Sequence, residues 1–129
     1  MNIMSKVKGS NAERELIRLF WSKNWAAARI AGSGSMHYPS PDILAGNTIR
    51  RLAIEVKFTK QNKKYFSKQD VKQLLNFSQY FGAEPWFAIK FKTDWLFFNP
   101  EDLDTTKTSF VADSSSMKGL TFEETVGII

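Results

Sequence analysis

Three charged side chains stand on or beside two short apolar segments in the first half of the sequence. Asp42 begins the run DILAG, and Glu55 and Lys57 interrupt the apolar run LAIEVKF thirteen residues further on. Burying a charge is costly unless the charge is paired or bound to a metal. Two neighbouring carboxylates can hold a hard cation such as magnesium, and a lysine beside that cation completes a centre able to cleave a phosphodiester.

Strand periodicity predicts how these side chains are presented. Alternate side chains of a strand over residues 50–58 point to opposite faces, so Glu55 and Lys57 project together from one face. The other, apolar face is expected to be the core face and contains Leu52, Ile54, Val56 and Phe58. An Asn-Thr turn is expected to fold residues 42–46 back along this strand as a hairpin, with Asp42 near Glu55. A polar strand face with a weak ion pair explains Glu55 and Lys57 alone, but not the second acid.

Composition limits the chemistry of such a site. The chain has 129 residues, no cysteine and one histidine, which excludes disulfides, thiolate sites and multi-histidine zinc sites. A metal must then be held mainly by carboxylates, which favours magnesium or manganese. The sequence has no signal-peptide pattern and no apolar run of about 18 residues. We therefore expect a soluble, intracellular protein that does not contact a membrane.

Charge is distributed unevenly along the chain. Residues 1–72 contain 14 Lys and Arg and 5 Asp and Glu, whereas residues 73–129 contain 4 and 8. A basic half that faces a polyanion such as nucleic acid explains this asymmetry. Chance clustering on a solvated surface explains it equally well.

The remaining pattern predicts one α/β domain over residues 1–129, with a central mixed sheet and few flanking helices. The expected elements are, in order, a helix at 9–24, strands at 25–32, 42–46 and 50–58, a helix at 67–82, strands at 85–92, 94–99 and near 109–114, and a brief helix within 120–129. Ser67 is expected to cap the second long helix and Gly82 to end it. Residues 59–66 are expected to form a basic loop.

Several segments of the chain carry a family resemblance. They are, in order, KGSNAEREL, AAARIAGSGS, PSPDILAG, AIEVK, QLLNFSQYFGAEPWFAIKF and FVADS. The spacing of the acid in PSPDILAG from AIEVK is the PD-(D/E)xK signature of restriction-endonuclease-like nucleases. In this order, from Lys8 to about residue 114, the segments resemble the archaeal Holliday junction resolvases of the Hjc type. The resemblance implies a restriction-endonuclease-like fold and a structure-specific endonuclease that resolves four-way DNA junctions by paired nicks in recombination and repair.

The resemblance also implies roles for individual residues. The matching catalytic positions are Glu13, Ser33, Asp42, Glu55 and Lys57. The implied metal ligands are the side chains of Glu13, Asp42 and Glu55, with the backbone carbonyl of Val56. The basic residues expected to contact DNA are Lys8, Arg14, Arg29, Lys60, Lys64 and Lys68, of which the two arginines match family positions. Without the resemblance, Glu13 and Arg29 are ordinary surface charges.

The implied cofactor is magnesium, with manganese able to substitute, and no small-molecule cofactor is expected. The implied partners are four-way junction DNA and a second copy of the chain, because a two-fold dimer presents matched active sites for two opposed nicks. Apolar residues of the second long helix could form either the dimer interface or the core; they are Leu74, Leu75, Phe77 and Phe81. The implied setting is the cytoplasm of an archaeal cell, for a protein of that cell or of an archaeal virus.

Two other functions are compatible with the pattern. An endonuclease of the same fold could act on other branched or duplex DNA. A basic DNA-binding module without activity could use Glu55 and Lys57 only as an ion pair. Acids in a basic cleft repel phosphate unless a cation lies between them, which argues against the second alternative.

Overall fold

The computed structural model describes residues 3–30 and 38–127. A five-stranded sheet with the strand order β1-β2-β3-β5-β6 forms its centre. Its strands are β1 (Ala26–Arg29), β2 (Ile43–Gly46), β3 (Arg51–Thr59), β5 (Glu84–Phe91) and β6 (Asp94–Phe98). The β3–β5 pair is parallel and the other pairs are antiparallel, so the sheet is mixed, as predicted.

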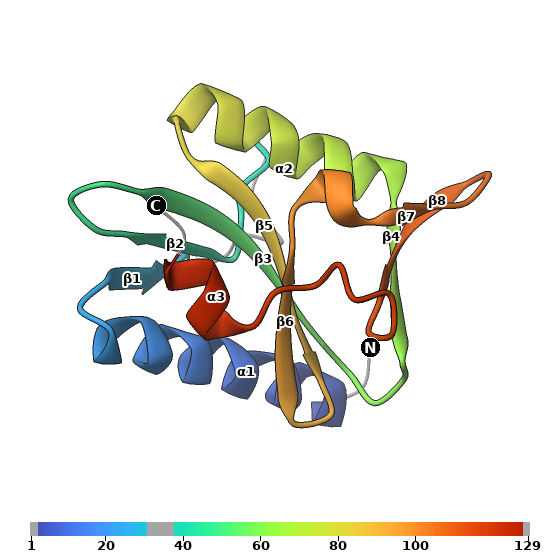
Figure 1. Ribbon diagram of the computed structural model, residues 1–129, viewed down its shortest axis with the longest axis horizontal. Helices are drawn as coiled ribbons and strands as arrows, with labels where there is room; N and C mark the ends of the chain where they lie inside the picture. The colour runs from blue at the N-terminus through green and yellow to red at the C-terminus, as the bar shows by residue number, and fades with distance from the viewer. Residues whose placement is uncertain (1–2, 31–37, 128–129) are drawn as a thin grey trace.

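Helices α1 (Ile3–Ser22) and α2 (Lys68–Phe81) cover opposite faces of this sheet (Figure 1). The apolar side of α1, including Leu16 and Phe20, packs on one face, and Val71 and Leu74 of α2 pack on the other. The expectation that only one face of β3 is core was wrong, because Ala53 is fully buried on the α2 side. A strand in the middle of a three-layer arrangement is covered on both faces.

The expected loop at 59–66 is largely a strand. Strand β4 (Lys63–Ser67) pairs with β8 (Ser109–Asp113), which pairs with β7 (Asp104–Thr105), in a second sheet of three strands. Phe66 of β4 is buried in the α2-side core, whereas Tyr65 is exposed. The lysines around Phe66 make this segment look like a polar loop in the sequence. Its partner strand β8 is more than 40 residues away along the chain, so the pairing does not follow from local patterns.

The ends of α2 follow the prediction. Ser67 Oγ accepts a hydrogen bond from the Asp70 N–H at 3.0 Å, and the Asp70 carboxylate accepts one from the Ser67 N–H at 3.1 Å. Gly82 ends the helix with φ of 82°, a left-handed conformation that glycine adopts without strain. This capping box fixes the position at which α2 begins.

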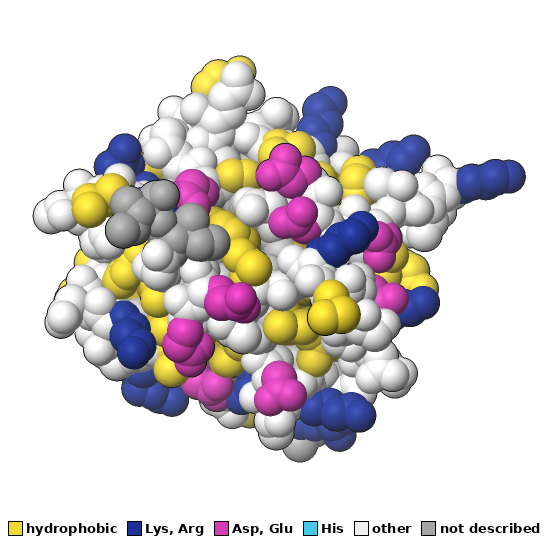
Figure 2. Space-filling model, viewed as in Figure 1, with side chains coloured by type: hydrophobic (Ala, Val, Ile, Leu, Met, Phe, Trp, Pro, Cys, Tyr) yellow, Lys and Arg dark blue, Asp and Glu magenta, His cyan; other side chains and the backbone are white. Residues whose placement is uncertain are grey.

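Two short helices complete the fold, one directly after β6 and one at the end of the described part of the chain. A short 3₁₀ helix (Pro100–Asp102) follows β6, and α3 (Phe122–Gly127) packs Phe122 against Phe20 and Phe97. Acidic side chains gather across the middle of the face shown in Figure 2, and most of the Lys and Arg side chains visible there lie nearer its margin. No helix among the described residues is long and apolar enough to cross a membrane.

Candidate active site

The β2–β3 hairpin brings Asp42 to β3. Ile43 pairs with Ile54, so Asp42 lies opposite the next residue of β3, Glu55. The Asp42 N–H donates to the Ile54 carbonyl at 3.0 Å, and the Asp42 carboxylate accepts a hydrogen bond from the Val56 N–H at 2.8 Å. Asp42 is therefore held by both its backbone and its side chain, in the position that the predicted hairpin requires.

Glu55 is the most strongly perturbed of these groups. Burial raises its pKa to about 8, and the negative charge of Asp42 contributes further to this rise. Lys57 opposes it, with its Nζ atom 3.9 Å from a Glu55 carboxylate oxygen. Lys57 therefore offsets only part of the effect that burial and the Asp42 charge have on the Glu55 pKa.

Helix α1 adds a third acid near this edge of the sheet. Glu13 forms an ion pair of 2.7 Å with Arg29, the last residue of β1. Burial and the charge of Asp42 raise the Glu13 pKa, while Arg29 and Lys57 lower it. Glu13 therefore interacts electrostatically with the Asp42 and Lys57 charges, although α1 and β3 are far apart in sequence.

The carboxylate oxygens of Asp42 and Glu55 are the kind of ligand that a hard cation prefers. Asp42 and Glu55 lie opposite each other on the β2–β3 hairpin, close enough for the Asp42 charge to raise the Glu55 pKa. The N–H and C=O of one strand residue point to the same side, so the Val56 carbonyl is expected to face the Asp42 side as its N–H does. Within residues 3–30 and 38–127, no group of three or more His, Asp or Glu is arranged to hold a metal. Glu13, paired with Arg29, does not complete such a group.

The predicted DNA-contact residues lie on several elements. Arg14 is exposed on α1, and its guanidinium donates a hydrogen bond of 2.8 Å to the Asn11 side chain. No described contact joins Arg14 to Asp42 or Glu55. The Arg29 side chain is half exposed beside Glu13, and Lys68 is exposed at the start of α2. Lys64 lies on β4 and is partly buried. Ser33 lies outside the described residues.

Asp70 is a residue near the site that the sequence analysis did not include. Its negative charge, in the first turn of α2, contributes to the raised pKa of Glu55. The motif from Ser67 to Asp70 signals a helix start but not the neighbour of that start. Only the packing of α2 on β3 brings the two acids near each other.

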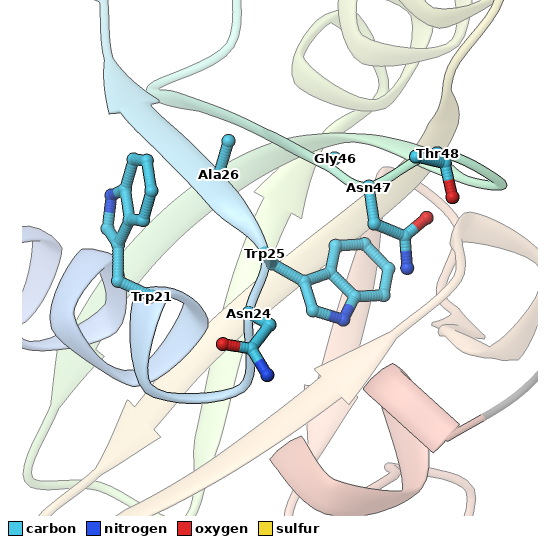
Figure 3. Close-up of a pocket in the computed structure, with 7 residues that line it drawn as sticks. All are labelled: Trp21, Asn24, Trp25, Ala26, Gly46, Asn47 and Thr48. Carbon is cyan, nitrogen blue, oxygen red and sulfur yellow. The ribbon is translucent and has the colours of Figure 1, made fainter.

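A separate hollow of about 720 Å³ lies away from these acids (Figure 3). Its lining residues are Trp21, Asn24, Trp25, Ala26, Gly46, Asn47 and Thr48. Ala26 and Gly46 pair at the end of the β1–β2 ladder opposite to Arg29 and Ile43, the end next to Asp42. Because this lining has no acid and no lysine, it lacks the groups needed for phosphodiester chemistry.

A mixed sheet between helices, with an acid beside one strand and Glu-x-Lys on the next, defines a restriction-endonuclease-like fold with a nuclease-type site. The family model described as "Archaeal holliday junction resolvase (hjc)" matches residues 4–129. The chain therefore belongs to the archaeal Holliday junction resolvase (Hjc) family.

Individual relatives agree with this assignment. The chain is 42% identical over 124 residues to crossover junction endodeoxyribonuclease Hjc of Archaeoglobus fulgidus. The matched region covers 95% of this chain and 91% of that protein. It is 40% identical over 106 residues to the Hjc of Methanocaldococcus jannaschii, with 82% of this chain and 76% of that protein covered. The crystal structure of A. fulgidus Hjc, described as a Holliday junction resolvase, superposes with a TM-score of 0.85 and 40% identity, covering 92% of this chain and 100% of that chain. These matches confirm the resemblance and the predicted fold class.

Proposed function

We propose that this chain is a crossover junction endodeoxyribonuclease that resolves four-way DNA junctions by paired nicks, in recombination and repair in the archaeal cytoplasm. The observation that carries the proposal is the Asp42–Glu55 pair, held by the β2–β3 hairpin with the Glu55 pKa raised to about 8. Two carboxylates held close together in a partly buried place repel each other, and a bound cation relieves that repulsion. Their placement becomes favourable when a cation and a phosphate are bound.

Magnesium, with manganese as a substitute, is the cofactor that this donor set suits. Asp42, Glu55 and the Val56 carbonyl would hold it, and when bound it supplies polarisation of the scissile phosphate and acidification of water. Glu13 is proposed as a further acid of the centre, held near it by Arg29. Hydrolysis by in-line attack of water leaves a 5′-phosphate and a 3′-hydroxyl.

Lys57 is proposed to act directly on the reacting groups. Its ammonium lies beside Glu55 on the same strand face, where it can orient the attacking water and offset charge developing on the phosphoryl oxygens. Lysine suits this role because it is a compact point charge. Ser33 is proposed as a further catalytic residue on the strength of its match in the family motif.

The substrate contacts are proposed to read backbone path and charge rather than base sequence. The residues proposed for these contacts are Lys8, Arg14, Arg29, Lys60, Lys64 and Lys68. They lie on α1, β1, β4 and the start of α2, and directly after the end of β3. A substrate with strands diverging in several directions can reach more of these elements than one linear duplex.

A homodimer is proposed to supply the two opposed nicks. Leu74 belongs to the core, but Leu75 and Phe81 of α2 are about half exposed. Phe81 also borders an apolar groove that runs over β1 and β2 to Trp21, on the part of the sheet that α2 leaves open. This continuous apolar surface suits contact with its copy on a second chain.

Nicking of a labelled four-way junction beside a linear duplex of the same sequence tests the activity. Reactions with magnesium and with chelator would compare wild type, Asp42→Asn and the control Asp104→Asn. Asp104 lies on β7 of the second sheet, and its carboxylate pairs with Lys118. We expect paired magnesium-dependent nicks near the branch point for wild type and the control, and none for Asp42→Asn. Equal cutting of duplex would indicate a general nuclease. Junction binding without cleavage under any divalent ion would indicate a binding module.

Light scattering of the purified protein tests the dimer. We expect wild type to have the mass of two chains and Phe81→Ser to shift toward one. Met117 is a suitable control because it is 94% exposed away from the groove, so Met117→Ser should remain dimeric. A wild-type monomer at micromolar concentration would contradict the proposed dimer.

A further inference from the structure

Two ammonium groups from different elements approach each other near the candidate active site. Lys8 lies on α1, and Lys60 directly follows β3, three residues after Lys57. The two side chains are near enough that Lys60 is the main cause of a lowered Lys8 pKa. The Lys8 ammonium also lies 5.8 Å from the centre of the Phe58 ring.

No acidic side chain in the described part of the protein forms an ion pair with either of these two lysines. Two like charges at close range repel, and the repulsion disappears when an anion lies between them. The arrangement is therefore better suited to a bound anion than to the free protein.

Gly9 beside Lys8 is a second, independent observation. It lies within the 20-residue helix α1, where glycine is less favourable than alanine. A Cβ atom added at Gly9 would meet nothing within 4 Å, so no described packing contact requires glycine there. Glycine in a helix also lets another backbone approach closely. Because Glu13 follows four residues later, Gly9 lies one turn away on the same side of α1.

We propose that Lys8, Gly9 and Lys60 together bind one backbone phosphate of the DNA strand that enters the active site. The sugar-phosphate backbone lies against the bare surface of α1 at Gly9, and both ammonium groups contact the same phosphate. This contact sets the position of the strand about one helical turn from Glu13, and so positions the neighbouring phosphodiester at the carboxylates. The inference rests on the proposed junction-cleaving function and adds to it a positioning site in which glycine is a functional residue.

Gly9→Ala separates this role from a structural one, because the two predict opposite results. Alanine favours the helix, so the melting temperature is expected to rise by about 2–4 °C. The added methyl group occupies the surface on which the strand lies, so the dissociation constant for a four-way junction is expected to increase about tenfold, measured in chelator to prevent cleavage. Gly127→Ala is the control, because a Cβ there also meets nothing and it lies in α3. It should leave junction binding unchanged.

The salt dependence of binding tests whether the lysines share one phosphate. Each phosphate neutralised on duplex DNA contributes about 0.9 to the slope of log K against log salt. If Lys8 and Lys60 share a phosphate, the double variant with both lysines changed to Gln loses about 0.9 from the slope, and each single variant loses less. Lys107→Gln, exposed between β7 and β8, should leave the slope unchanged.

Two results would overturn the inference. A Gly9→Ala protein that is more stable and binds the junction as wild type does would show that the strand does not lie at Gly9. A loss of about 1.8 in the slope for the double lysine variant would show two independent phosphate contacts. Both measurements use binding alone, so they stand apart from the nicking assay of wild type, whose failure would contradict the proposed function itself.

Discussion

The start and the middle of β3 carry charged groups whose charges are balanced in different ways. Just before β3, the buried Arg50 guanidinium donates two hydrogen bonds of 2.8 Å to Glu84 and one of 2.7 Å to the Thr125 carbonyl. Its guanidinium carbon also lies 5.3 Å from the centre of the Trp25 ring. Further along the strand, Glu55 lies beside Asp42, and among the described residues its ion-pair partner is Lys57, at 3.9 Å.

The pKa shifts of the two carboxyl groups express this difference. Hydrogen bonds from Arg50 lower the pKa of Glu84, whereas burial and Asp42 raise that of Glu55 to about 8. A charge that finds its partners inside the protein stabilises the fold. A charge without enough partners destabilises the free protein and becomes favourable only with a ligand. The comparison therefore indicates that the Arg50–Glu84 pair stabilises the fold, and it supports the proposal that Glu55 serves function.

The largest expected effect is that of Glu55→Gln on cleavage. Loss of this carboxylate should reduce junction nicking in magnesium by at least about a thousandfold, since a charged group at the reacting centre is removed. Glutamine has nearly the same shape, so the protein should still fold. Nicking rates and a thermal unfolding scan in chelator would measure both effects.

The same variant should be as stable as wild type or more stable. A raised native pKa means that ionising Glu55 opposes folding as the pH rises from 4.5 towards about 8. Glu55→Gln removes this cost, so any gain in stability should be greatest near pH 8. A clear loss of stability at pH 8 in chelator would indicate that Glu55 supports the fold and would break the comparison.

The opposite pattern is expected for Glu84→Gln. Arg50 would lose its charged partner while remaining buried, and we expect a loss of about 1–3 kcal/mol in the free energy of unfolding. The lower part of this range is favoured because the Glu84 side chain is 39% exposed. Cleavage by the folded variant should equal that of wild type. Urea unfolding measures the loss of stability, and a nicking assay at low temperature measures cleavage. A strongly reduced nicking rate would show that the Arg50–Glu84 pair is also needed for activity.

The stabilisation by Glu84 should also depend on pH in a defined direction. Because its native pKa is lowered from 4.5, its contribution is fully present above pH 4.5 and is lost as the pH falls through the lowered pKa. The stability difference between wild type and Glu84→Gln should therefore shrink from pH 6 to pH 3. Unfolding curves at several pH values test this, and a constant difference would mean that the charge of Glu84 does not matter.

The predictability of the two regions from sequence differs for a physical reason. The hairpin that joins Asp42 to Glu55 is local, so a turn, a short apolar segment and one alternating pattern were sufficient to predict it. The Arg50–Glu84 pair and the Glu13–Arg29 pair join residues far apart in sequence, and neither follows from local patterns. Strand β4 was missed for the same reason, because its pairing with β8 is long-range. The family resemblance, not residue spacing, pointed to Glu13.

The smallest expected effect on nicking is that of Ser67→Ala, at a position that lies close to the candidate active site but stabilises the fold. Ser67 caps α2, whose first turn includes Asp70 near Glu55, and both hydrogen bonds of its capping box are made. Ser67→Ala should cost about 1 kcal/mol of stability, the usual value of an N-cap, and should leave the nicking rate within about threefold of wild type. Ser109→Ala, on the strand partner of Ser67, is a control for loss of a hydroxyl without loss of a helix cap. Ser67→Ala could instead lose nicking activity while remaining folded. That result would show that closeness to Glu55, and not whether a charge is balanced inside the protein, decides which residues matter for activity.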